Sequence, residues 1–223
     1  MTSPEGLDPE YDASRVRLGT AVRNLGHLVV GREVGSDEMD RLAALLETEA
    51  SLLELAPRRV RDLSHIGASM MAAPADGARL PSHIARPGSG PGSPHGFPMV
   101  VHREGGRAVA RFRMGPAHEG PPQRAHGGIV ALAFDDALGF VLNMHQVIAY
   151  TAKLSISYRA GTPLETPLVV SAWLDRREGR KCFIESDLRE DREDAPVIAE
   201  CSALFVALDQ HPGISGTLST TTA

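Results

Sequence analysis

The sequence predicts an α+β domain, in which an antiparallel sheet covers one buried helix, preceded by a helical extension. Residues 127–142 are apolar on nearly every side, apart from the adjacent carboxylates Asp135 and Asp136. Segments rich in β-branched and aromatic residues lie on both sides of this stretch. A run of strands that contains a single apolar helix is typical of a two-layer α+β architecture.

Four regions follow from length and composition. The chain has 223 residues, which suggests one domain plus an extension. We expect a helical extension over residues 1–70, a linker rich in Pro, Gly and Ser over 71–97, the sheet-and-helix domain over 98–210, and a disordered tail over 211–223.

The extension is predicted to be a helical hairpin. Residues 12–30 have an amphipathic pattern, and Gly31 is a plausible stop. Residues 36–57 predict a second helix, with Ser36 as its N-cap and Pro57 at its end. No site chemistry occurs in either segment, so packing or assembly is the expected role of the hairpin.

Six strands are predicted around the apolar helix. Two precede it and form a hairpin around Gly105-Gly106, and four follow it: 98–104, 107–114, 147–159, 166–177, 181–190 and 196–208. The apolar segment itself is too long for an ordinary strand, and its Leu, Ala and Phe residues favour a helix. Because it lacks a polar face, this helix should be buried.

Two features of the helix suggest chemistry. Gly127 and Gly128 leave the first backbone N–H groups uncovered at the positive end of the helix dipole, where they suit a developing oxyanion. Alternatively, the glycines only turn the chain into the helix. A carboxylate within an apolar helix is usually functional or salt-bridged, because an unpaired buried charge is costly.

Composition excludes several classes of function. The net charge of −5 argues against a nucleic-acid surface. Cys182 and Cys201 form no metal spacing, so we expect no metal site. The N-terminus lacks the apolar core of a secretory signal, and no run reaches the expected length of a transmembrane helix. We therefore expect a cytoplasmic protein that does not bind a membrane.

The order of elements and one motif resemble a known family. Two strands, a helix led by His-Gly-Gly, and four strands are the order of the hotdog fold. The run from Glu119 to Gly128, with Asp135 nine residues after His126, resembles the signature of acyl-CoA thioesterases of the phenylacetate-degradation (PaaI) type. It is similar also to mitochondrial thioesterase-superfamily enzymes, which share the Gly-Pro-Pro lead-in and a later Glu-Gly-Arg-Lys turn. The resemblance covers roughly residues 98–208.

The resemblance implies a catalytic set for acyl-CoA hydrolysis. Asp135 matches the catalytic carboxylate, which acts as a general base on water or as a nucleophile. Gly127 matches the residue whose backbone N–H polarises the thioester carbonyl, and His126 stands beside it. Thr151 matches a Ser/Thr that helps to place the attacking water. No cofactor is implied, because coenzyme A is part of the substrate.

The resemblance also implies contacts to coenzyme A from Ser157, Arg159, Arg180 and Lys181. The family often shows Asn and Lys where this chain has Ser157 and Arg159. Arg180 and Lys181 belong to a basic run at a hairpin turn, which is either a solvated turn or a phosphate site.

The spacing of the catalytic set predicts an oligomer. Gly127 and Asp135 lie eight residues apart on a helix, or ~12 Å. They cannot both reach one thioester carbon, so the carboxylate must come from a second subunit. We therefore expect an obligate homodimer with two equivalent sites. The sequence does not decide whether dimers pair into a tetramer.

Several alternatives remain open at this point. Asp136 is expected to be salt-bridged or at the rim of the site, and His126 is either a chemical participant or a hydrogen-bonded residue at the helix start. Two other functions compete with hydrolysis: a hotdog hydratase or dehydratase, and a non-catalytic acyl-CoA-sensing module whose output would be the helical hairpin.

Overall fold

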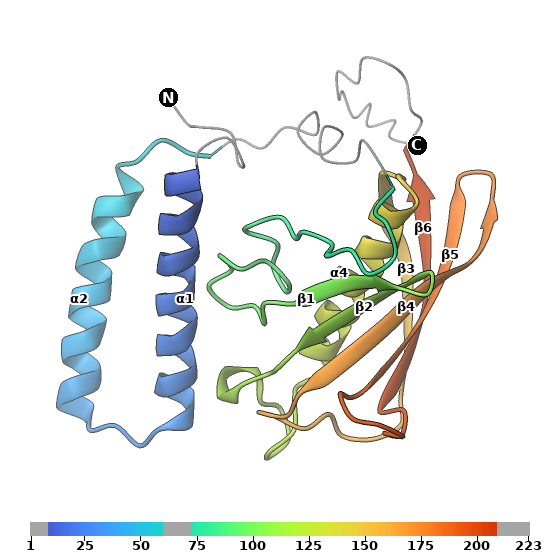
Figure 1. Ribbon diagram of the computed structural model, residues 1–223. Coiled ribbons are helices and arrows are strands. Elements are labelled where there is room, and N and C mark those ends of the chain that lie inside the picture. Colours follow the sequence, from blue (N-terminus) through green and yellow to red (C-terminus); the bar gives the residue numbers. More distant parts are fainter. Residues whose placement is uncertain (1–8, 60–72, 209–223) are drawn as a thin grey trace, which may run out of the picture.

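A six-stranded antiparallel sheet curls around one long helix in the computed structural model, and two further helices stand beside it (Figure 1). The structure describes residues 9–59 and 73–208, so the predicted tail and the end of the predicted extension lie outside the described residues. The elements are α1 (Pro9–Gly31), α2 (Ser36–Glu54), β1 (Val100–Glu104), β2 (Arg107–Phe112), η1 (Pro116–His118), α4 (Gly127–Met144), β3 (Ala149–Tyr158), β4 (Leu168–Glu178), β5 (Lys181–Glu190) and β6 (Ala199–Ala207). The predicted fold class is confirmed.

The strand order is β1-β2-β4-β5-β6-β3, which leaves β3 at one edge of the sheet. Among the described strands, β3 pairs only with β6. The register with β6 shows which neighbours lie beside each end of β3. Thr151 lies opposite Phe205, which lies opposite Cys182 near the β4–β5 turn. Tyr158 lies opposite Ala199 at the other end.

The core lies between α4 and the inner face of the sheet. Alternate residues of β6, from Ala199 to Ala207, are buried against the helix, and those between them are exposed or half-buried. Phe134, Leu138 and Phe140 of α4 are fully buried. By length and composition α4 would pass for a membrane span, contrary to the sequence expectation, but the buried core helix of a globular protein meets the same criteria.

The segment predicted as a linker packs against the domain over its described part, 73–97. Leu80 donates its backbone N–H to Val101 of β1, and Phe97 and Ser89 are almost fully buried. This segment differs from the solvated linker that its composition suggests, because its contacts are non-local. Its anchor is Asp136 of α4, which accepts the backbone N–H groups of Gly88 and Ser89 at 3.0 and 2.5 Å. We call residues 84–93 the strap.

Helix α1 docks on the strap and on η1. Gly19 is its buried residue, and a Cβ there would lie 2.2 Å from the carbonyl oxygen of Gly92. Arg23 donates to the carbonyl of Ser93, and the His27 ring contacts the His118 ring at 4.8 Å. Glycine therefore permits close approach of helix and strap.

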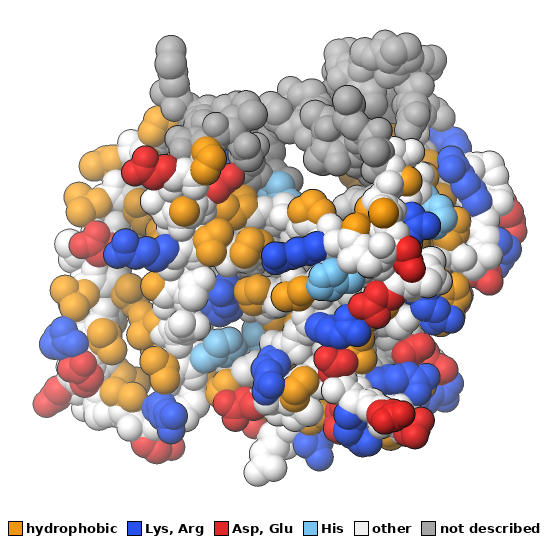
Figure 2. All heavy atoms as spheres, in the orientation of Figure 1, with side chains coloured by type: hydrophobic (Ala, Val, Ile, Leu, Met, Phe, Trp, Pro, Cys, Tyr) orange, Lys and Arg blue, Asp and Glu red, His pale blue; other side chains and the backbone are white. Residues whose placement is uncertain are grey.

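Helix α2 has no buried residue, and its leucines stay in contact with solvent. Hydrophobic side chains run along α1 and α2 at the left of the space-filling view (Figure 2). The predicted N-cap is wrong by one position: Gly35 caps α2 without a side-chain hydrogen bond, and Ser36 is the first helical residue. Helix α2 ends at Glu54, three residues before Pro57.

Candidate active site

The start of α4 presents one free backbone donor. His126 is the N-cap, and its Nδ1 accepts the N–H of Gly128 at 3.0 Å. The N–H of Gly127 has no acceptor among the residues that the structure describes. The first N–H groups of a helix lack intrahelical partners and carry its partial positive charge. Gly127 can therefore donate to a carbonyl oxygen or oxyanion placed beyond the helix end.

Tyr158 reaches the same helix start from the end of β3. Its hydroxyl donates to the carbonyl oxygen of Gly127 at 2.8 Å. Burial raises the pKa of Tyr158 above its ordinary value, so the hydroxyl stays protonated at neutral pH. Tyr158 lies outside the sequence motif. The contact is non-local, joining residues 31 positions apart, and no local pattern signals it.

Asp135 and Thr151 meet at the other end of β3. The Thr151 hydroxyl donates to Asp135 Oδ1 at 2.8 Å. Asp135 is half-buried and Thr151 is exposed, so the pair faces the surface beside the open edge of the sheet. The structure thus brings together the two residues that the motif predicted for handling water.

Asp136 has the opposite environment. It is 5% exposed, and its carboxylate is held by the Arg86 guanidinium at 3.3 Å and by two strap N–H groups. Arg86 in turn lies over the Phe140 ring and against Gly139, where a Cβ would be 2.0 Å from the guanidinium. The salt-bridged alternative for Asp136 is therefore correct. These contacts occupy Asp136, whereas Asp135 is the carboxylate that remains partly open to solvent.

The two halves of the predicted catalytic set lie apart in one subunit. Thr151, which binds Asp135, and Tyr158, which binds Gly127, are seven residues apart on β3. At about 3.3 Å per residue this is about 23 Å. One protomer does not bring its own Asp135 and Gly127 to the same reacting atom.

The residues predicted to contact coenzyme A divide between the same two ends. Arg180 and Lys181 lie at the β4–β5 turn, at the end where Asp135 lies, and Arg180 Nε donates to the carbonyl of Ala207. Ser157 and Arg159 lie at the opposite end, where Arg159 forms an ion pair with Glu200 at 2.7 Å. The predicted four residues thus do not form one cluster within a protomer.

Further positive charge surrounds the end of the molecule that holds Asp135. Burial lowers the pKa of His145, the C-cap of α4, and the charges of Arg103 and Arg177 lower it further. Arg103 comes from β1 and Arg177 from β4, so two strands far apart in the sequence bring cations close to His145. Arg177 also pairs with Cys182, next to Arg180 and Lys181. The sequence did not single out Arg103, because only the fold brings β1 near the helix end.

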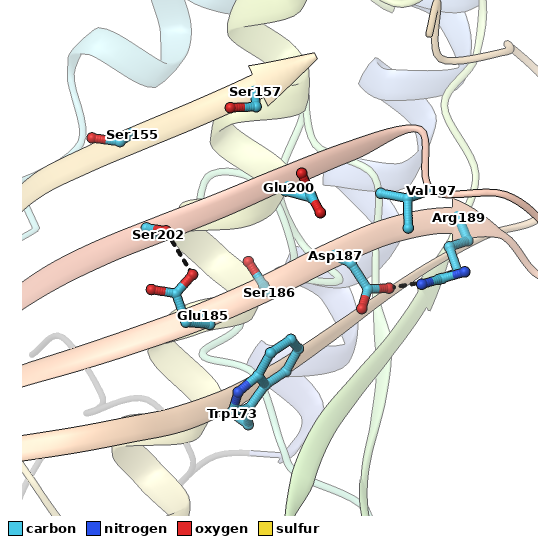
Figure 3. Close-up of a pocket in the computed structure, with 10 residues that line it drawn as sticks. All are labelled: Ser155, Ser157, Trp173, Glu185, Ser186, Asp187, Arg189, Val197, Glu200 and Ser202. Carbon is cyan, nitrogen blue, oxygen red and sulfur yellow. Dashed lines mark hydrogen bonds and ion pairs between the residues drawn. The ribbon is translucent and has the colours of Figure 1, made fainter. Parts of the chain in front are cut away.

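A hollow lies on the outer face of the sheet, away from α4 (Figure 3). The strand alternation places most of its lining residues on the face opposite the core: Ser155, Ser157, Trp173, Glu185, Asp187, Arg189, Glu200 and Ser202. Ser202 donates to Glu185 at 2.6 Å, and Arg189 pairs with Asp187 at 2.9 Å. The hollow contains Ser157 but none of the predicted catalytic residues.

The described residues do not favour catalysis by a cysteine nucleophile or by a metal ion. Burial raises the pKa of Cys201 to about 12, so this residue stays a neutral thiol and a poor nucleophile. Within residues 9–59 and 73–208, no three His, Cys, Asp or Glu side chains are grouped so that they could hold a metal ion.

The chain resembles known thioesterases. Residues 123–196 match the model of the family described as Thioesterase superfamily. Acyl-coenzyme A thioesterase THEM4 of Bos taurus is 34% identical over 116 residues, which are 51% of this chain and 47% of that protein. THEM4 of Xenopus laevis is 31% identical over 110 residues, or 49% of each chain. This chain thus spans about half the length of these relatives.

A solved structure resembles more of the chain. The crystal structure of a thioesterase superfamily protein superposes with a TM-score of 0.71 and 25% identity, covering 92% of this chain and 94% of that one. Because this coverage exceeds the sheet-and-helix domain, the similarity extends into the N-terminal helices.

Proposed function

We propose that this chain, which carries a Thioesterase superfamily domain, is an acyl-CoA thioesterase that hydrolyses its substrate to free acid and coenzyme A. One observation carries the proposal. Of two adjacent carboxylates in an apolar helix, Asp136 is saturated by structural contacts, whereas Asp135 faces outward and is held by the Thr151 hydroxyl. The similarity to acyl-coenzyme A thioesterases named THEM4 supports the choice of substrate class.

In the proposed reaction the thioester carbonyl oxygen accepts a hydrogen bond from the Gly127 N–H, at the positive end of α4. Asp135 removes a proton from water, or attacks the carbonyl itself to give an anhydride that water then cleaves. The Thr151 hydroxyl, anchored on Asp135, offers its lone pairs to the water. The carbon–sulfur bond breaks, and the coenzyme A thiolate takes up a proton. Water is the only co-reactant, and in this proposal Asp135 supplies the base or nucleophile that the reaction needs.

The proposed site is shared between two subunits. The uncovered edge of β3 is a template for pairing with another strand. An antiparallel pairing of two β3 strands about a two-fold axis near Leu154 would bring Thr151 of one protomer close to the Tyr158 end of the other. Asp135 would then act beside Gly127 of the partner subunit, and each homodimer would contain two sites.

The coenzyme A phosphates have a proposed binding surface near Asp135. Arg180 and Lys181 lie at this end of the sheet, together with Arg177. A protein with net charge −5 needs such a local cluster to attract an anionic nucleotide. In the proposed dimer, Ser157 and Arg159 of the partner subunit come to the same site, where Arg159 would exchange its Glu200 partner for a phosphate.

We also propose that the enzyme works in the cytoplasm, where its two free cysteines would stay reduced.

Release of free thiol from a panel of acyl-CoAs tests the proposed function. The panel should contain short, medium and long alkyl chains and one aryl chain, with product analysis for hydration and a separate binding measurement. We expect thiol release without a hydrated product. Hydration without thiol release would instead indicate a hydratase, and binding with neither product would indicate a sensing module; either result overturns the proposal.

A further inference from the structure

We propose that Tyr158 is a positioning residue that holds the Gly127 backbone amide in the orientation needed to receive the thioester oxyanion. This inference rests on the proposed function and assigns a role to a residue outside the motif. Tyr158 acts through the backbone of Gly127 and not on the reacting atoms themselves.

The peptide unit between Gly127 and Gly128 is held from both sides. Its carbonyl oxygen accepts the Tyr158 hydroxyl at 2.8 Å, and its N–H donates to His126 Nδ1 at 3.0 Å. Two consecutive glycines give the backbone more conformational freedom than any other pair of residues. The two hydrogen bonds fix the peptide unit that directly follows the Gly127 N–H, and so they limit the rotation about the Gly127 backbone bonds that would turn this N–H relative to the helix.

The Tyr158 ring also packs beside the helix start, within van der Waals reach of the space at position 127. A Cβ there would lie 3.5 Å from the Tyr158 ring, so the ring already lies against the Gly127 backbone. The ring and hydroxyl come from β3, which is fixed along its whole length by β6. A rigid strand thus sets the orientation of a flexible helix start, in keeping with preorganised donors stabilising charge that develops in a transition state.

Tyr158→Phe tests the inference, because it removes the hydroxyl and keeps the ring. Complete removal of an oxyanion donor typically costs about 10²–10³ in rate, and loss of its restraint should cost less. We expect kcat to fall about tenfold, with KM within about twofold of wild type, because the oxyanion interaction forms only in the transition state. The melting temperature should stay close to that of the wild type.

Tyr11→Phe is the matched control, since Tyr11 lies on α1 and its hydroxyl accepts from Arg15. This control should leave both kinetic constants unchanged. If Tyr158→Phe keeps the wild-type kcat, or raises KM alone, the positioning role is wrong, although the proposed hydrolysis stands. If the wild-type chain releases no thiol from any acyl-CoA, the proposed function itself fails.

Discussion

Asp135 and Asp136 are adjacent on α4 but have very different surroundings. Asp136 accepts two backbone N–H groups and an Arg86 ion pair, and these contacts offset the cost of its burial. Asp135 has one hydroxyl partner and an open side. The helical repeat turns the two side chains about 100° apart, so one faces the strap and the other faces β3.

Asp135→Asn should remove the general base or nucleophile while keeping an acceptor for the Thr151 hydroxyl. We expect kcat, measured by thiol release, to fall by about 10²–10⁴. The free energy of unfolding, measured by chemical denaturation, should change little. Asp136→Asn is the contrasting variant: it leaves Arg86 without its ion pair and should lower stability by about 3 kcal/mol, while the folded fraction remains active. Near-wild-type turnover by Asp135→Asn would disprove the assignment.

The docking of α1 depends on close backbone approach at one position. Gly19→Ala would place a methyl group 2.2 Å from the Gly92 carbonyl oxygen, and we expect a loss of about 1–3 kcal/mol in unfolding free energy. Gly26→Ala is a matched control on the same helix, because a Cβ there meets nothing within 4 Å. It should gain about 0.5–1 kcal/mol from helix propensity. Equal effects of both changes on thermal unfolding would show that α1 is not docked as described.

The contact between α1 and η1 should respond to pH. His27 Nδ1 accepts the N–H of Ala117 at 3.1 Å, and His118 Nδ1 accepts that of Gly115 at 3.1 Å, so both rings must be neutral at Nδ1. Burial lowers the pKa of His27 and His118; Arg23 lowers both further, and Glu165 opposes the shift at His27.

A lowered histidine pKa in the folded state means that the unfolded chain takes up protons first as the pH falls. Stability from these contacts is therefore complete above about pH 6.5, the unfolded value, and is lost as the pH falls below it. Urea unfolding at pH 7.5 and pH 5 should show this loss, and His118→Asn should be less stable throughout but lose less between the two pH values. An equal loss in the variant would contradict this account.

The elements were predictable from sequence to different degrees, for physical reasons. Burial on one face gives β6 its strict alternation, and burial on all sides gives α4 its apolar run, so both follow from local pattern. The strap could not be predicted, because its order comes from Asp136 and Arg86, which lie about 50 residues apart, and its Gly and Pro content is that of a linker.

The residues of the candidate site also differ in how far the sequence could predict them. The motif located Gly127 and Asp135, since both sit on one helix with fixed spacing. Tyr158 and Arg103 were missed, because their relation to the site depends on which strands the fold brings beside each end of α4. The ion pair between Arg159 and Glu200 was missed too, because it depends on the register of β3 with β6.

At the scale of the whole molecule, the groups of the proposed site lie at two separate ends of one protomer. One end has the carboxylate, the Thr151 hydroxyl and the basic surface, and the other has the free amide and Tyr158. A two-fold axis across the β3 edge would bring the carboxylate end of each protomer to the amide end of its partner, which would complete two sites. We therefore predict that the enzyme is inactive as a monomer.

Subunit complementation tests this claim most directly. Gly127→Pro removes the donor N–H. Proline is well tolerated at the first position of a helix. His126 already has the extended backbone conformation (φ −64°, ψ 136°) that a residue before proline adopts. Asp135→Asn and Gly127→Pro should each be inactive alone. When the two variants are coexpressed in equal amounts, about half of the dimers contain one subunit of each kind. Each mixed dimer has one intact site out of two, so we expect roughly a quarter of wild-type thiol release. Mixed dimers, purified by separate tags, that show no activity would contradict the shared site.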